Sequence, residues 1–325
     1  MGRKRKSILL AVVLLFSLCG GKAMAAPVSM QKTPSFLLLE GGAEMEWPCG
    51  VPFCDPGFRA LDRDGQERND QVQTQGQVVS WKPGEYELRY SFVDSEGCRL
   101  QRERRVRVVP AELPETVQRE KVVYLSFDDG PCQNTREVLE LLEKYDAKAS
   151  FFVILNQKKY LDLLPEIREA GHSIGIHAYK HPYEWLYLSE ESFFEDFMRA
   201  QEILYDYTGS YACISRFPGG SRTANGYLSV KMEDGWKGVE QRLADMGIRY
   251  YDWNMQIEAS RSGSSEQTFQ NFCQMLPEQS VPIVLQHDTR DYSVKALEKI
   301  LQWGTENGYR FEAMDNTVPE VHFYE

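Results

Sequence analysis

The sequence has 325 residues, and beyond its N-terminus it lacks any segment apolar enough to span a membrane. Basic residues are also in short supply, since 37 Lys and Arg stand against 48 Asp and Glu and give a formal net charge of -11. An acidic surface repels phosphate backbones, so nucleic acid is a poor partner and a neutral or weakly charged substrate is favoured. With 42% apolar residues the chain can bury the core of one large domain or two moderate ones.

The N-terminus has the three parts of a secretory signal peptide. Arg3 to Lys6 form a basic region, an apolar run from Ile8 to Leu18 follows, and Ala23-Met24-Ala25 matches an A-x-A cleavage site. We therefore predict a signal peptide over residues 1–25 and a secreted or cell-wall-associated protein. An uncleaved anchor is the alternative, although the run is shorter than the roughly 20 residues that span a bilayer. A lipid attached at Cys19 is disfavoured, because a leucine precedes this cysteine where a small residue is required.

Cysteine and histidine are both scarce, with seven and five residues respectively. Export leads to an oxidising space, where Cys49 and Cys54 are close enough in sequence to pair locally. The cysteine spacing matches no zinc-ribbon pattern, so any metal must be held by other ligands. The cysteines that remain after cleavage are Cys49, Cys54, Cys98, Cys132, Cys213 and Cys273.

Residues 34–110 contain no histidine and read as short β-like runs separated by Gly, Asp and Pro. Turn residues at this interval, with alternating apolar positions between them, predict a small antiparallel sandwich. A D-P-G-F turn from Asp55, a P-G-x-Y-x-L-x-Y strand from Pro83 and a final R-x-V-x-V strand from Arg105 follow in order. This order resembles the bacterial immunoglobulin-like modules of secreted enzymes, which are usually spacers or adhesion units. We expect a spacer.

From residue 118 to residue 325 apolar runs alternate with helical stretches. The pattern predicts strands near residues 122–125, 150–154, 173–176 and 281–285, with helices over 135–145, 189–207 and 292–307. Such alternation predicts an α/β fold with a parallel sheet or barrel, whose active-site groups lie at the carboxyl ends of the strands.

Polar residues gather at those strand ends. Asp128 and Asp129 follow the first strand, and two adjacent carboxylates beyond a buried strand usually need a nearby cation. A solvated turn is the alternative for this pair taken alone. His177 and His181 follow the strand over 173–176, and a helical turn would put both imidazoles on one side, where they suit Zn²⁺ and similar metals.

The other three histidines receive different interpretations. His287 also follows a predicted strand and belongs with the candidate site. His172 stands at the start of its strand, at the wrong end for the site, and we expect it to be structural. His322 receives no role.

Together these segments resemble the NodB homology domain of carbohydrate esterase family 4, the polysaccharide deacetylases. The resemblance spans about Lys121 to Phe311 and implies a distorted (β/α) barrel. The family motif [TS]-F-D-D-G-P is matched from Ser126, which implies that Asp128 is the general base and Asp129 a metal ligand. The H-x-x-x-H motif implies that His177 and His181 complete a divalent metal site for Zn²⁺, with Co²⁺ and Ni²⁺ as alternatives.

Two further motifs complete the resemblance. An R-x-P stretch implies that Arg216 orients the base, while the N–H of Gly219, directly after Pro218, stabilises the oxyanion. An L-x-H-D stretch implies that His287 is the general acid and that Leu285 lines the acetyl pocket.

The chain departs from the family pattern at two points. Family members commonly carry an Asp-Trp pair whose aspartate tunes the acid histidine. Asp252-Trp253 has these letters, but we expect Trp253 to align with an earlier tryptophan of the motif and to contact substrate, leaving Glu258 or no residue in the aspartate's place. Gly219 stands where an aromatic residue is usual, which keeps the backbone donor and widens the cleft.

The resulting hypothesis is hydrolysis of N-acetyl groups on a glycan. Peptidoglycan N-acetylglucosamine is the preferred substrate, with chitin-like polymers, xylan and exopolysaccharides as alternatives. A glycosidase is a rival, but its two carboxyls come from different elements and flank a sugar at roughly 5 Å or more, unlike adjacent aspartates. A catalytically silent glycan-binding or adhesion protein is a second rival.

Overall fold

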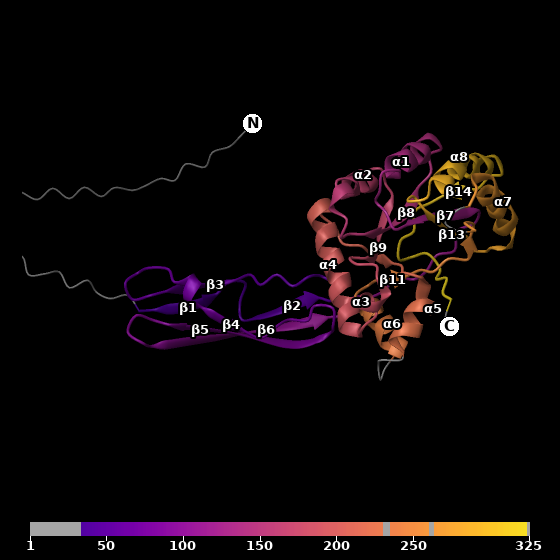
Figure 1. The fold of residues 1–325 in the computed structure, drawn as a ribbon. Coiled ribbons are helices and arrows are strands. Elements are labelled where there is room, and N and C mark those ends of the chain that lie inside the picture. The colour runs from indigo at the N-terminus through magenta and orange to yellow at the C-terminus, as the bar shows by residue number, and fades with distance from the viewer. Residues whose placement is uncertain (1–33, 230–234, 260–262, 324–325) are drawn as a thin grey trace, which may run out of the picture.

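The computed structural model describes residues 34–229, 235–259 and 263–323, which form a β-sandwich joined to an α/β unit (Figure 1). The predicted signal peptide, with Cys19, lies outside these residues. Within the described residues, no helix has both the length and the apolar character needed to cross a bilayer.

The first unit contains two small sheets, as the sequence predicts. One pairs β1 with β3, and the other has the order β2-β6-β5-β4. The predicted antiparallel pairing is confirmed for β1–β3, β4–β5 and β5–β6 but is wrong for β2, which pairs with β6 in parallel. Alternate side chains are buried along part of β5, part of β6 and β1, so each sheet has one core face. All six cysteines in the described chain are free, so Cys49 and Cys54 do not pair. The strands are β1 (Phe36–Leu39), β2 (Glu44–Pro48), β3 (Phe58–Leu61), β4 (Gln73–Gln75), β5 (Gly84–Val93) and β6 (Arg99–Val109).

A buried arginine explains the D-P-G turn of the sandwich. The guanidinium of Arg104 is fully buried and donates to the Asp55 carboxylate and to the carbonyl oxygens of Glu40, Gly42 and Gly57. A buried cation needs such partners to offset its desolvation. The turn therefore supplies the acceptors that let Arg104 fold into the core.

The second unit is built on an eight-stranded sheet with the order β11-β10-β9-β8-β7-β13-β12, and β14 also pairs with β7. All pairings within it are parallel. The end strands β11 and β12 are not paired with each other in the described chain, so the sheet is a barrel with a gap. The strands are β7 (Val122–Asp128), β8 (Ala149–Ile154), β9 (Ser173–Ala178), β10 (Ile214–Ser215), β11 (Arg249–Tyr250), β12 (Met255–Gln256), β13 (Ile283–His287) and β14 (Arg310–Phe311).

Helices cover the outside of this sheet (Figure 1). The three helices predicted from apolar periodicity are present as α1, α4 and α8. Helix α4 begins after a capping box between Ser189 and Ser192, and its C-cap is Gly209 in the left-handed region. Local sequence therefore determines both where the helix starts and where it ends. The helices are α1 (Thr135–Lys144), α2 (Leu163–Glu169), α3 (Tyr183–Leu186), α4 (Glu190–Thr208), α5 (Gly220–Leu228), α6 (Gly235–Asp245), α7 (Ser265–Met275) and α8 (Asp291–Glu306).

Candidate active site

The carboxyl ends of the central strands bring the predicted catalytic residues together. Asp128 is the last residue of β7, His287 is the last residue of β13, and the two are paired in register. His177 lies near the end of β9, and Arg216 directly follows β10. All of these strands are parallel, so their ends meet at one edge of the sheet.

Asp129, His177 and His181 form a group that fits a divalent metal. The Asp129 backbone is in the left-handed region, with a φ of 71°. Its Oδ1 atom lies 3.5 Å from His177 Nε2 and 3.6 Å from His181 Nε2. Their ligand atoms all lie within 4.8 Å of one another. The Asp129 Oδ1 atom is buried and has no hydrogen-bond partner in the described part of the chain. A cation shared with the imidazoles would satisfy this oxygen.

The histidines are in a form suited to ligation. Nδ1 of His177 lies 2.8 Å from the carbonyl oxygen of Arg216, which can only accept, so Nδ1 carries the proton and Nε2 is left for a metal. Burial, followed by the neighbouring His177, lowers the pKa of His181. Neutral His181 is therefore the dominant form at pH 7.

The helical turn predicted for the histidine pair is wrong. His177 is part of strand β9, and His181 lies in the loop before α3, which begins at Tyr183. The loop nevertheless turns the His181 ring to within 5.5 Å of the His177 ring, measured between centroids. Tertiary contacts to the loop, rather than helical periodicity, place the second ligand.

Arg216 holds Asp128 in place. The fully buried guanidinium donates to Asp128 Oδ1 at 2.9 Å and to Ser126 Oγ at 2.6 Å. Its other nitrogens donate to the carbonyl oxygens of Tyr251 and Asp252, and the group stacks on the Phe152 ring at 4.1 Å. The arginine is therefore fixed by its surroundings and fixes the carboxylate, as a base-orienting residue must.

The residue paired with His287 is Glu258, which settles the open alternative at the fourth motif. Glu258 Oε2 accepts from His287 Nδ1 at 2.7 Å, and the His287 Nε2 lies 3.8 Å from Asp129. Asp252 instead accepts from the backbone N–H groups of Ser221 and Phe323, so its role is structural. Burial alone would lower the pKa of His287, but the Glu258 hydrogen bond and the charge of Asp128 outweigh burial and raise it. The raised pKa favours the protonated ring that a general acid requires.

Replacing Glu258 by Gln tests this pairing. We expect kcat to fall about 10- to 100-fold with little change in KM, because the ring loses the anionic acceptor that orients it and raises its pKa. Asp252→Asn is the matched control: it costs about 1–3 kcal/mol of stability through mispaired buried N–H groups but leaves kcat near that of the wild type. Steady-state acetate release and thermal unfolding measure both effects, and equal losses of kcat in the two variants would contradict the pairing.

Gly219 and Tyr183 form one wall of the site. The Gly219 N–H has no acceptor in the described chain and is free for a ligand, and the residue has a φ of 77°. A Cβ at this position would lie 2.7 Å from Tyr183 Oη. The Tyr183 ring also packs against His181 at 5.4 Å. The expected widening of the cleft is therefore wrong at this point, since Tyr183 from α3 fills space that the glycine leaves.

Gly219→Ala should damage the site through this contact. A left-handed alanine costs about 1 kcal/mol, and displacement of Tyr183 or of the Gly219 backbone should lower kcat by about 10²-fold. Adding Tyr183→Phe removes the clashing hydroxyl and should restore part of the loss. Gly226→Ala within α5 is the matched control, because nothing lies within 4 Å of its added Cβ. A Gly219→Ala enzyme as active as Gly226→Ala would show that the wall has no role.

The remaining predicted residues have different surroundings. Pro218 is buried, and its carbonyl oxygen accepts from the Tyr187 hydroxyl. Leu285 is buried in β13 opposite Ser126, and Trp253 is half-buried with its ring 5.7 Å from the Arg216 guanidinium. Their contacts with substrate remain predictions. His172 accepts from the backbone N–H of Ala149, away from the site, which fits its structural role.

Comparisons with known proteins agree with this site. A family model described as polysaccharide deacetylase matches residues 115–233, and one described as bacterial surface protein, Ig-like domain, matches residues 37–108. A peptidoglycan-N-acetylglucosamine deacetylase of Bacillus cereus is 32% identical over 206 residues, covering 62% of this chain and 71% of the relative.

Solved structures give the same result. The catalytic domain of a peptidoglycan N-acetylglucosamine deacetylase from Eubacterium rectale matches with a TM-score of 0.59 and 35% identity, covering 65% of this chain and 96% of that one. A polysaccharide deacetylase of Bacillus cereus matches with a TM-score of 0.55 and 28% identity over 63% and 98% of the two chains. The chain therefore belongs to the polysaccharide deacetylase family and carries a bacterial Ig-like domain before its catalytic part.

Proposed function

We propose that this enzyme removes acetyl groups from N-acetylglucosamine units of peptidoglycan, with a divalent metal, Zn²⁺ in preference to Co²⁺ or Ni²⁺. The observation that carries the proposal is the arrangement around Asp129. A carboxylate fixed by an arginine, a histidine whose pKa is raised by its bond to Glu258, and an Asp-His-His ligand set lie at one edge of the sheet. These are the groups that amide hydrolysis needs, and each has its own supporting contacts.

Each residue has one task in the proposed reaction. Asp129, His177 and His181 would hold the metal, which would supply Lewis acidity for the attack of a water on the amide. Asp128 accepts a proton from that water as its oxygen attacks the acetyl carbon. The Gly219 N–H donates to the developing oxyanion. His287 then gives its proton to the departing nitrogen, so the products are acetate and a free glucosamine amine.

The two aspartates serve separate tasks because their carboxylates face different partners. Asp128 faces Arg216, whereas Asp129 faces the histidines. A glycosidase would use its two carboxyls on opposite sides of a sugar ring. Adjacent residues that share one strand end fit a base and a ligand better.

An open cleft of about 650 Å³ adjoins the site and offers room for the sugar chain. It is lined by Asp129, by the loop after β13 and by the start of α8, where Arg290, Tyr292 and Lys295 lie. An open cleft suits a polymer that extends beyond the reacting unit. Together with the predicted signal peptide over residues 1–25, it supports action on the cell wall. We also propose the boundaries 34–110 and 118–325 for the two domains.

A substrate panel tests the proposal. We expect acetate release from peptidoglycan and, more slowly, from chitin oligomers, with no new reducing ends, and loss of release after chelation. Acetylxylan, an O-acetylated polymer, should be the poorest substrate. Faster release from acetylxylan would overturn the choice of substrate, and new reducing ends would indicate a glycosidase. Re-addition of Zn²⁺, Co²⁺ or Ni²⁺ to the chelated enzyme ranks the metals.

A further inference from the structure

Helix α4 lies between the sandwich and the histidine loop of the catalytic unit. In Figure 1 the end of the sandwich that holds β2 and β6 meets the catalytic unit near α4 and α6. Buried side chains of the sandwich, including Val106 and Val108, belong to the same apolar cluster as the core of the catalytic unit. A sandwich that served only as a spacer would not share a hydrophobic core with the catalytic unit.

One set of contacts joins the sandwich to α4. The Trp81 ring stacks on Phe194 of α4, with centroids 4.9 Å apart and planes at 12°, and Phe194 is fully buried. Arg242 of α6 lies 5.2 Å from the Trp81 ring and forms an ion pair with Glu190 in the first turn of α4. Trp81 thus contacts both helices that face the sandwich.

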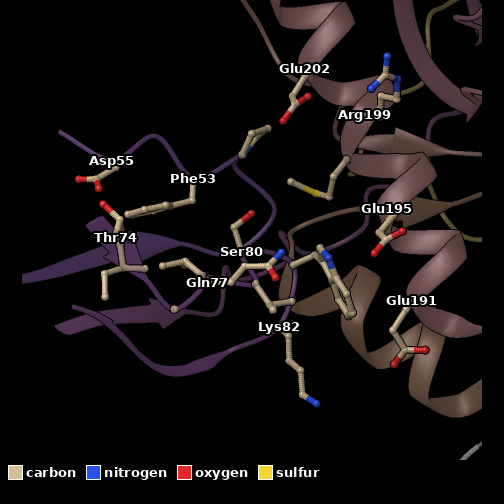
Figure 2. A pocket seen from close by; sticks show the side chains of 17 residues that line it. Phe53, Asp55, Thr74, Gln77, Ser80, Lys82, Glu191, Glu195, Arg199 and Glu202 are labelled. Carbon is tan, nitrogen blue, oxygen red and sulfur yellow. The ribbon is translucent and has the colours of Figure 1, made fainter. Parts of the chain in front are cut away.

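A cleft beside this contact shows how the two units meet (Figure 2). Its volume is about 750 Å³, with Gln77, Ser80 and Lys82 of the sandwich on one side and Glu195 and Arg199 of α4 on the other. Beside this open cleft, the half-buried Trp81 ring on the buried Phe194 ring is one contact that links the sandwich directly to α4.

A second set of contacts joins α4 to the histidine loop. The Asp196 carboxylate accepts from the backbone N–H groups of Tyr179, at 2.7 Å, and Lys180, at 2.9 Å. Both amides lie between the two predicted metal histidines. The Arg199 guanidinium lies 4.6 Å from the Tyr179 ring. Phe194 and Asp196 are two positions apart, so they project from different sides of the helix.

Two backbone hydrogen bonds anchor the loop to the partly buried Asp196 carboxylate. Burial raises the pKa of Asp196 to about 6, while the two backbone donors act in the opposite direction. The carboxylate is therefore ionised at neutral pH and its bonds are charge-assisted. The charged groups that act on it from the loop and from its own helix are Lys180 and Arg199. Tyr179 and Lys180 lie between β9 and α3, so these two bonds anchor backbone that belongs to neither element.

We propose that the Ig-like sandwich supports the histidine loop through α4, with Trp81 and Asp196 as positioning residues on two sides of the helix. The sandwich holds α4 in place, and α4 holds the loop between His177 and His181. The inference rests on the proposed function only for the metal that the loop binds. The sandwich is then part of the catalytic unit's framework rather than a spacer.

Amide hydrogen exchange of the metal-free full chain tests the link between α4 and the loop. Asp196→Ala should speed exchange at Tyr179 and Lys180 and weaken Zn²⁺ binding about 10- to 100-fold, the range for residues that orient ligands. Asp196→Asn keeps one acceptor oxygen and should restore part of both properties. Unchanged exchange and affinity in Asp196→Ala would overturn this link. Both measurements need no substrate, so they remain decisive even if the enzyme acts on another glycan.

Trp81 variants test the link between the sandwich and α4. Trp81→Ala should also speed exchange at Tyr179 and Lys180 and weaken Zn²⁺ binding, whereas Trp81→Phe keeps a stacked ring and should behave like wild type. Leu37→Ala is the matched control, because Leu37 is buried in a separate core of the sandwich. Saturating Zn²⁺ should recover most of the lost kcat of Trp81→Ala with KM unchanged. If Trp81→Ala and Leu37→Ala leave the loop equally unaffected, the sandwich is a spacer.

Discussion

Asp128→Asn should abolish nearly all acetate release while leaving the protein folded and able to bind metal. The amide keeps an oxygen that can accept from Arg216 at the 2.9 Å position but cannot take a proton from water. Loss of a general base lowers kcat by about 10²- to 10⁴-fold. KM should change little, because Asp128 has no assigned contact with the sugar.

The design separates loss of the base from loss of the fold. Removing the charge of Asp128 leaves Arg216 as a buried cation with a weaker partner, which lowers stability as well. Thermal unfolding and Zn²⁺ binding are therefore measured alongside kcat. Asp162→Asn is the matched control, because Asp162 is exposed at the start of α2. An Asp128→Asn enzyme with more than a tenth of wild-type kcat would exclude Asp128 as the base.

His177→Ala should remove bound metal and activity together. The substitution takes away the ligand whose Nε2 lies 3.5 Å from Asp129 and whose proton is held by the Arg216 carbonyl. Without the metal, the transition state loses several kcal/mol of charge stabilisation, which corresponds to a fall of about 10³-fold or more. His181→Ala should act in the same direction, and metal analysis of the purified variants measures the first effect.

His322→Ala provides the comparison for these variants. His322 is half-buried and stacks on Tyr250 at 3.9 Å, apart from the ligand set. It should retain both metal and acetate release. If His177→Ala and His181→Ala kept wild-type metal content, the ligand assignment would fail, whatever their activity.

The parts of the site that could be predicted from sequence are those whose position follows from the neighbouring residues in the chain. Asp128, Asp129 and His287 stand at the ends of apolar strands, and parallel strands bring such ends together without further information. The sandwich could be predicted for a similar reason, because its turns recur along the chain. The positions of α1, α4 and α8 followed from apolar periodicity, and each helix ends within a few residues of its prediction.

The parts that could not be predicted depend on contacts between distant segments. The sequence left Glu258 or no residue as the partner of His287, and only the structure decides between them. Glu258 reaches the His287 ring because it follows β12, which pairs in parallel with β13. Tyr183 occupies the space beside Gly219 only once α3 packs against α5. Asp196 has no signal in the sequence, since an acid on a helix face is most often a solvated one. The docking of the sandwich on α4 likewise depends on contacts between segments that are distant in the sequence.

The most direct test of the central claim is a Zn²⁺ titration of the metal-free enzyme, in which bound metal and acetate release from peptidoglycan are measured on the same samples. We expect the metal-free protein to be inactive and acetate release to rise in proportion to bound Zn²⁺ up to one ion per chain. His177→Ala should show neither response. Full acetate release from the metal-free enzyme, or one bound ion per chain in His177→Ala, would contradict the claim.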